Sequence, residues 1–119
     1  MSDNGPESSP VLDVQGTLDR FGGDTILFAE MADLLLEDLP SLFDELRAAV
    51  RSKDAIGVRE RAHALKGLVA GCGGERATRV AQSLESAGQS EDLSQAPNLI
   101  ESLAVELQAL IRALRDFRQ

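Results

Sequence analysis

The chain has 119 residues, of which 43% are hydrophobic and 27% are charged, and these proportions fit one globular domain with a modest core. Its formal charge of −8 argues against binding to nucleic acid or to an anionic membrane surface, because both require clustered Lys and Arg side chains. Aromatic residues make up only 3% of the chain, which favours helices packed on helices over a β-rich core.

The N-terminal region predicts a tail followed by one short helix. Residues 1–10, MSDNGPESSP, are rich in Ser, Pro, Gly and acidic side chains, so we expect a disordered tail and a domain that occupies residues 11–119. Residues 11–21, VLDVQGTLDRF, predict a short helix that ends at Gly22 and Gly23.

A long amphipathic helix is predicted next, with Asp24 as its N-cap. Pro40 lies inside this segment and predicts either a kink or a division into two helices, because proline lacks the backbone donor and crowds the preceding turn. The apolar stripe expected to face the core consists of Leu27, Met31, Leu34, Leu35, Leu39, Leu42, Phe43, Leu46 and Val50.

Three more helices complete the predicted fold. The first is capped by Asp54 and runs to about Gly71, and the second covers residues 75–88 and ends at Gly88. Pro97 suits the first turn of the last helix. Its apolar stripe consists of Leu99, Leu103, Leu107, Leu110, Leu114 and Phe117. The sequence therefore predicts an all-α protein, an antiparallel up-and-down four-helix bundle with a short extra N-terminal helix.

His63 is the only histidine in the chain, and it lies off the core side of its helix. At 100° per residue, the core stripe of this helix comprises Val58, Ala62, Leu65, Val69 and Cys72, whereas Arg59, Lys66, Gly67 and Ala70 share the side of His63. The simplest interpretation of such a histidine is an idle surface residue.

Two neighbours of His63 favour a functional interpretation. Lys66, three residues later, places an ammonium group beside the imidazole. Gly67 costs the helix about 1 kcal/mol relative to alanine, and it leaves bare backbone that another molecule could approach.

The motif AHALKG at residues 62–67 resembles the histidine-containing phosphotransfer (HPt) domain of multistep phosphorelays. The resemblance extends to Gly73, ten positions after His63, and to Leu84 and Glu85, 21 and 22 positions after it. Together with the pattern of the upstream helices it covers roughly residues 12–117.

The resemblance implies that His63 accepts a phosphoryl group from the aspartyl phosphate of one receiver domain and passes it to another receiver domain. Lys66 would offset the phosphoryl charge, and Glu85 would orient the imidazole through its proximal nitrogen, although Glu85 could instead be a solvated acid at a helix end. The residues expected to contact the partner are Ile56, Arg59, Gly67, Ala70 and Gln82.

No cofactor or metal site is expected in this chain, because one histidine and one cysteine cannot form a zinc site, and the Mg²⁺ of phosphoryl transfer should belong to the receiver partner. The expected partners are response-regulator receiver domains, with a hybrid histidine kinase as a further candidate. We expect a cytoplasmic protein, since the sequence lacks a signal peptide, a membrane span and a second cysteine. We also expect a monomer, because the apolar stripes of the helices can pack against one another, and we expect no autokinase or phosphatase activity.

Two other functions are alternatives to phosphotransfer. A docking module that binds receivers or kinases without being phosphorylated would not need the intact His-x-x-Lys-Gly motif. A histidine kinase would need a nucleotide-binding domain, which 119 residues cannot also hold. The sequence leaves open whether the chain is a free-standing protein or the excised C-terminal domain of a hybrid sensor kinase.

Overall fold

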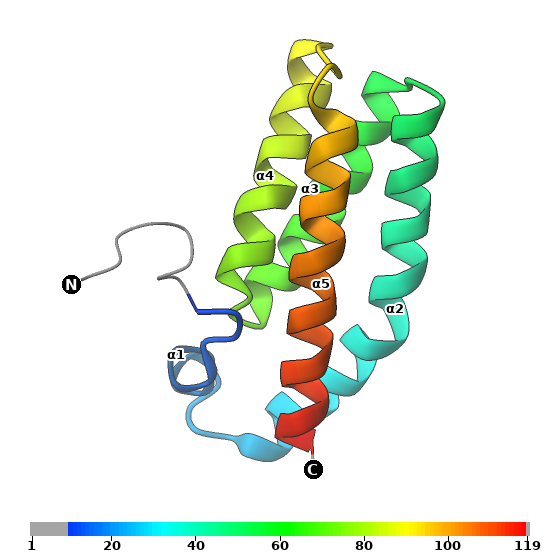
Figure 1. Cartoon of the computed structure of the whole chain (residues 1–119). Helices are drawn as coiled ribbons and strands as arrows, with labels where there is room; N and C mark the ends of the chain where they lie inside the picture. The colour runs from blue at the N-terminus through cyan, green and yellow to red at the C-terminus, as the bar shows by residue number, and fades with distance from the viewer. Residues whose placement is uncertain (1–9, 119) are drawn as a thin grey trace, which may run out of the picture.

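The structure is a computed structural model that describes residues 10–118, so the tail predicted for residues 1–10 lies almost wholly outside the described residues. Within this range all regular structure is helical, which confirms the predicted fold class. The helices are α1 (Val14–Arg20), α2 (Thr25–Arg51), α3 (Ala55–Gly71), α4 (Glu75–Ser90) and α5 (Ala96–Arg118). Figure 1 shows α2 to α5 running up and down beside one another, with α1 lying near the start of α2.

The predicted helix starts and stops are largely confirmed. Asp24 and Asp54 cap α2 and α3, each accepting a backbone N–H at 3.0 Å through its carboxylate. Gly22 and Gly23 follow α1 with φ of +67° and +80°, a left-handed conformation that glycine adopts without strain. The two aspartate caps fix where α2 and α3 begin.

Pro40 bends α2 and does not divide it. The helix is continuous from Thr25 to Arg51 with Pro40 inside, and Figure 1 shows the change of direction within its first half. Of the two interpretations of Pro40, the kink is therefore correct.

The predicted core face of α2 is wrong at two positions before Pro40. Leu27 and Leu34 are 46% and 61% exposed, whereas Phe28 and Ala32 are fully buried. Two aromatic side chains explain the difference. The Phe28 ring stacks on the Phe117 ring with 4.6 Å between their centroids, so the side of α2 that carries Phe28 faces the core.

Gly88 does not end α4, contrary to the prediction. The helix continues to Ser90, and Glu91 makes the turn with φ of +58°. Gly88 is buried, and a Cβ atom at this position would lie 2.6 Å from the backbone nitrogen of Arg59 and 2.7 Å from the carbonyl oxygen of Ala55. This glycine therefore permits α3 and α4 to approach closely.

The predicted core stripe of α3 is confirmed, since Val58, Ala62, Leu65, Val69 and Cys72 are all fully buried. Burial raises the pKa of the Cys72 thiol to about 11, so this cysteine remains protonated in the core. On α5 the buried side chains are Ala96, Ile100, Leu103, Leu107, Leu110 and Leu114, and Leu99 and Phe117 are half-buried. None of the described helices is long and apolar enough to cross a bilayer.

Candidate functional site

His63 lies in the middle of α3 on the surface of the bundle, where its side chain is 68% exposed. Its neighbours Ala62 and Leu65 are fully buried, so the backbone that carries the imidazole is anchored on its opposite side. The helix therefore presents the ring to solvent from a rigid support.

Glu85 on α4 holds one nitrogen of the imidazole. Its Oε2 lies 2.9 Å from Nδ1 of His63. The Lys66 ammonium and, to a smaller degree, the His63 imidazole lower the pKa of the Glu85 carboxyl against the opposing effect of burial. An ionised carboxylate only accepts hydrogen bonds, so Nδ1 is the donor in this contact, and in the neutral ring Nε2 keeps a free lone pair.

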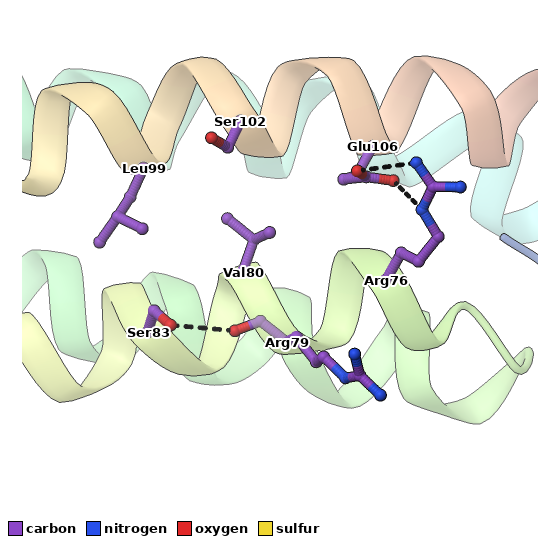
Figure 2. Close-up of a pocket in the computed structure, with 7 residues that line it drawn as sticks. All are labelled: Arg76, Arg79, Val80, Ser83, Leu99, Ser102 and Glu106. Carbon is purple, nitrogen blue, oxygen red and sulfur yellow. Dashed lines mark hydrogen bonds and ion pairs between the residues drawn. The ribbon is translucent and has the colours of Figure 1, made fainter. Parts of the chain in front are cut away.

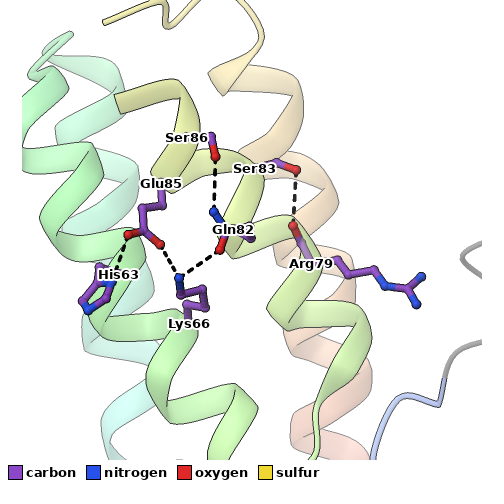
Figure 3. A network of polar contacts seen from close by, with 7 residues as sticks. All are labelled: His63, Lys66, Arg79, Gln82, Ser83, Glu85 and Ser86. Atoms are coloured by element: carbon purple, nitrogen blue, oxygen red, sulfur yellow. Dashed lines mark hydrogen bonds and ion pairs between the residues drawn. The ribbon is translucent and has the colours of Figure 1, made fainter. Parts of the chain in front are cut away.

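Lys66 is held on the same carboxylate. Its Nζ lies 2.6 Å from Oε1 of Glu85, an otherwise unpartnered buried oxygen, and it donates a hydrogen bond of 2.9 Å to Oε1 of Gln82. The amide of Gln82 in turn donates to the hydroxyl of Ser86 at 3.2 Å. Figure 3 shows the resulting chain of contacts, in which Glu85 reaches from α4 between His63 and Lys66. Each oxygen of Glu85 thus has one partner on α3.

The other residues predicted to contact a partner lie on the outer side of α3. Ile56, Arg59, Gly67 and Ala70 are exposed, and Ile56 is 63% exposed despite its aliphatic side chain. A Cβ atom added to Gly67 would meet nothing within 4 Å. The surface around His63 is therefore open to a molecule as large as another protein domain.

A hollow lies between α4 and α5, away from the imidazole (Figure 2). Arg76 and Glu106 form an ion pair across it, with Nε and Oε1 2.9 Å apart. Because Glu106 neutralises the charge of Arg76, we assign no role to this hollow. In the part of the chain that the structure describes, no three His, Cys, Asp or Glu side chains are grouped closely enough to hold a metal ion.

His63, Lys66, Glu85 and Gln82, all predicted from the sequence, lie together in the structure, whereas Ser86 was not predicted. The only available signal was its spacing, since Ser86 follows Gln82 by four residues and so lies one turn further along the same helix face.

The structure thus defines an all-helical bundle that presents one exposed imidazole, held by a carboxylate, on its surface. The chain belongs to the Hpt domain family, whose sequence profile matches residues 30–117. Its role is therefore histidine phosphotransfer in phosphorelays, in which proteins of this family interact with receiver domains and kinases.

The fold is also similar to the crystal structure of histidine-containing phosphotransfer protein B (HptB) from Pseudomonas aeruginosa PAO1. The two chains share 25% sequence identity with a TM-score of 0.86, and the match covers 94% of this chain and 97% of that chain. A search of curated protein sequences gave no significant match.

Proposed function

We propose that His63 is the phosphoacceptor, and that it takes a phosphoryl group from the aspartate of one receiver domain and passes it to the aspartate of another. The observation that carries this proposal is the contact between Glu85 and Nδ1 of His63, because it leaves Nε2 unprotonated on an imidazole that is 68% exposed. An unprotonated ring nitrogen at the surface is the nucleophile that the reaction requires.

The proposed transfer step involves Nε2 of His63, the aspartyl phosphate of the receiver and the carboxylate of Glu85. The lone pair of Nε2 attacks the phosphorus of the receiver's aspartyl phosphate, a P–N bond forms, and the P–O bond to the aspartate breaks and releases its carboxylate. The ring gains positive charge, and Glu85 stabilises that charge through the retained Nδ1–H. The reverse sequence passes the group to the next receiver domain.

Lys66 is proposed to offset the charge of the phosphoryl group, and Gln82 to hold the ammonium group near it. Ile56, Arg59, Gly67 and Ala70 are proposed to form the contact surface for the receiver, which would supply the Mg²⁺. We propose a cytoplasmic monomer, with a bundle domain at residues 11–119 that has neither autokinase nor phosphatase activity.

The proposal is tested with a receiver domain that carries a labelled aspartyl phosphate. Incubation with this chain should move the label to an acid-labile, base-stable site, which is the signature of a phosphoramidate. A base-labile label would place the group on a carboxylate and contradict the proposal. If none of the receiver domains encoded in the source genome donates the label, the unphosphorylated docking module becomes the better interpretation.

Replacing Lys66 by alanine should slow transfer and shorten the lifetime of the phosphohistidine, because the ammonium nearest the imidazole is lost. The change also leaves Oε1 of Glu85 buried without a cation, so the free energy of unfolding should fall by about 1 kcal/mol. Transfer assays quenched at successive times measure the transfer rate and the phosphohistidine lifetime, and chemical denaturation measures the free energy of unfolding. Arg51→Ala, which removes an exposed cation from the end of α2, is the matched control, and equal kinetics in both variants would make Lys66 an ordinary surface charge.

A further inference from the structure

Gly88 lies beside the contact between Glu85 and His63. The contact joins the antiparallel helices α4 and α3, and Figure 3 shows Glu85 reaching across from one to the other. Gly88 follows Glu85 by three residues on α4, and the backbone that it faces on α3 belongs to Arg59, four residues before His63. Three or four residues make about one helical turn, so the close approach at Gly88 is one turn away from the hydrogen bond that holds the imidazole.

The backbones of α3 and α4 touch at Gly88. A Cβ atom at this position would lie 2.6 Å from the nitrogen of Arg59, 2.7 Å from the carbonyl oxygen of Ala55 and 2.9 Å from the Cα of Arg59. Non-bonded heavy atoms are in favourable contact at about 3.5–4.0 Å. Any side chain at position 88 would therefore push α4 away from α3 by on the order of 1 Å.

The Glu85 carboxylate depends on this spacing of the helices. Its Oε2 lies 2.9 Å from Nδ1 of His63 and its Oε1 lies 2.6 Å from Nζ of Lys66, so both of its partners are on α3. The side chain of Glu85 is only 17% exposed, which limits the rotamers with which it could follow them. A separation of about 1 Å would lengthen both contacts, and a donor–acceptor distance of about 4 Å is no longer a hydrogen bond.

Neither a helix end nor the backbone conformation explains the glycine at position 88. The helix continues to Ser90, and Gly88 does not have the positive φ of Gly22, Gly23 and Gly73. Glycine inside a helix is less favourable than alanine. What this glycine provides is the close approach of α4 to α3, at the turn next to Glu85.

The position of the carboxylate determines which ring nitrogen of His63 carries the proton. With the Glu85 carboxylate against Nδ1, the neutral ring keeps its proton on Nδ1 and leaves the lone pair on Nε2. Without this acceptor, water would solvate both nitrogens of an imidazole that is 68% exposed, and the two tautomers would be mixed. Fewer molecules would then present an unprotonated Nε2.

We propose that Gly88 is a positioning residue for phosphoryl transfer, because the close approach that it permits between α3 and α4 holds the Glu85 carboxylate on Nδ1 and so keeps Nε2 of His63 free to attack phosphorus. This inference rests on the proposed function, since it concerns the nitrogen that accepts the group. Gly88 acts through Glu85 and does not itself contact the imidazole.

Nitrogen-15 NMR of the unphosphorylated protein measures the tautomer directly, and assignment is simple because His63 is the only histidine. In Gly88→Ala, at a pH where the ring is neutral, the Nε2 resonance should shift toward that of a protonated nitrogen. Leu114→Ala is the matched control, because it also lowers the melting temperature but removes a buried side chain of α5. It should leave the resonance unchanged.

Both variants are made in a Gly71→Ala background to keep them folded. Gly71 is an exposed helical glycine whose added Cβ would meet nothing within 4 Å, so its replacement by alanine should raise the melting temperature. Circular dichroism checks that every variant is folded at the temperature of measurement.

Transfer kinetics test whether Gly88 acts through the carboxylate. The rate of uptake from a phosphorylated receiver should fall by on the order of tenfold in Gly88→Ala and stay within about twofold of the background in Leu114→Ala. A double variant with Glu85→Gln should be no slower than Glu85→Gln alone, because the carboxylate that Gly88 positions is already absent.

Three results would overturn the inference. An unchanged Nε2 resonance in Gly88→Ala would show that the carboxylate follows the imidazole. Equal shifts in Gly88→Ala and Leu114→Ala would indicate a general loosening of the bundle, and additive losses of rate in the double variant would show that Gly88 acts by another route. A chain that takes no label from any receiver contradicts the proposed function, whereas the NMR measurement, which needs no receiver, still decides the role of Gly88.

Discussion

Replacing His63 by glutamine is expected to abolish phosphoryl uptake and to leave the fold intact. Glutamine fills a similar space but offers no nucleophilic ring nitrogen, so no P–N bond can form. The side chain is 68% exposed and makes one polar contact, with Glu85, so the free energy of unfolding should change by less than about 1 kcal/mol. Intact-protein mass spectrometry after incubation with a phosphorylated receiver measures uptake, and circular dichroism checks the fold.

Glu85→Gln is the informative companion to this variant. It keeps the imidazole but removes the charge that fixes Nδ1 and pairs with Lys66. We expect it to accept the group more slowly than the natural protein and still to be labelled. Labelling of His63→Gln to the natural extent would show that another residue is the acceptor.

Gly88→Ala should destabilise the bundle by about 3 kcal/mol. The added Cβ would lie 2.6 Å from the Arg59 nitrogen, 2.7 Å from the Ala55 oxygen and 2.9 Å from the Arg59 Cα, all of them backbone atoms of α3. Since backbone cannot turn aside as a side chain can, α3 and α4 must separate. The melting temperature should fall by roughly 10 °C.

Gly67→Ala is the matched control, because it makes the same substitution inside a helix where the new methyl group meets nothing within 4 Å. This variant should be stabilised by roughly 0.5–1 kcal/mol. Gly88→Ala should also weaken the contact of His63 with Glu85, since Glu85 lies one turn before Gly88 on the displaced helix. A melting temperature equal to that of the natural protein would mean that the helices are not in close contact at this point.

The sequence predicted the helices of the bundle well, because their caps and periodic apolar residues act locally. It could not decide which side of α2 is buried. Leu27, Met31 and Leu34 have the same spacing as Phe28, Ala32 and Leu35, and the two stripes differ by one residue. Leucine at two of the three positions made the first stripe look like core, and only the packing of Phe28 on α5 resolves the choice.

Contacts between helices, which a local sequence pattern does not reveal, also limited the predictions for Gly88 and for Glu85. Gly88 looked like a helix stop because sequence does not reveal a neighbouring backbone. The spacing of the motif placed His63 and Lys66 one turn apart on a surface face, as the structure has them. The division of the Glu85 carboxylate between these two side chains depends on how α3 and α4 are aligned, which no local pattern specifies.

Pro40 has a consequence for local unfolding of α2. It has no backbone N–H, so the carbonyl of Leu36 lacks the partner that a regular helix would provide, and the hydrogen-bond ladder of α2 is interrupted. Residues 25–39 can therefore fray as a cooperative unit of their own, with faster amide hydrogen exchange than the half of the helix that packs beside His63. Opening of the segment before Pro40 would therefore leave intact the helix pair α3 and α4, which carries the imidazole and its carboxylate.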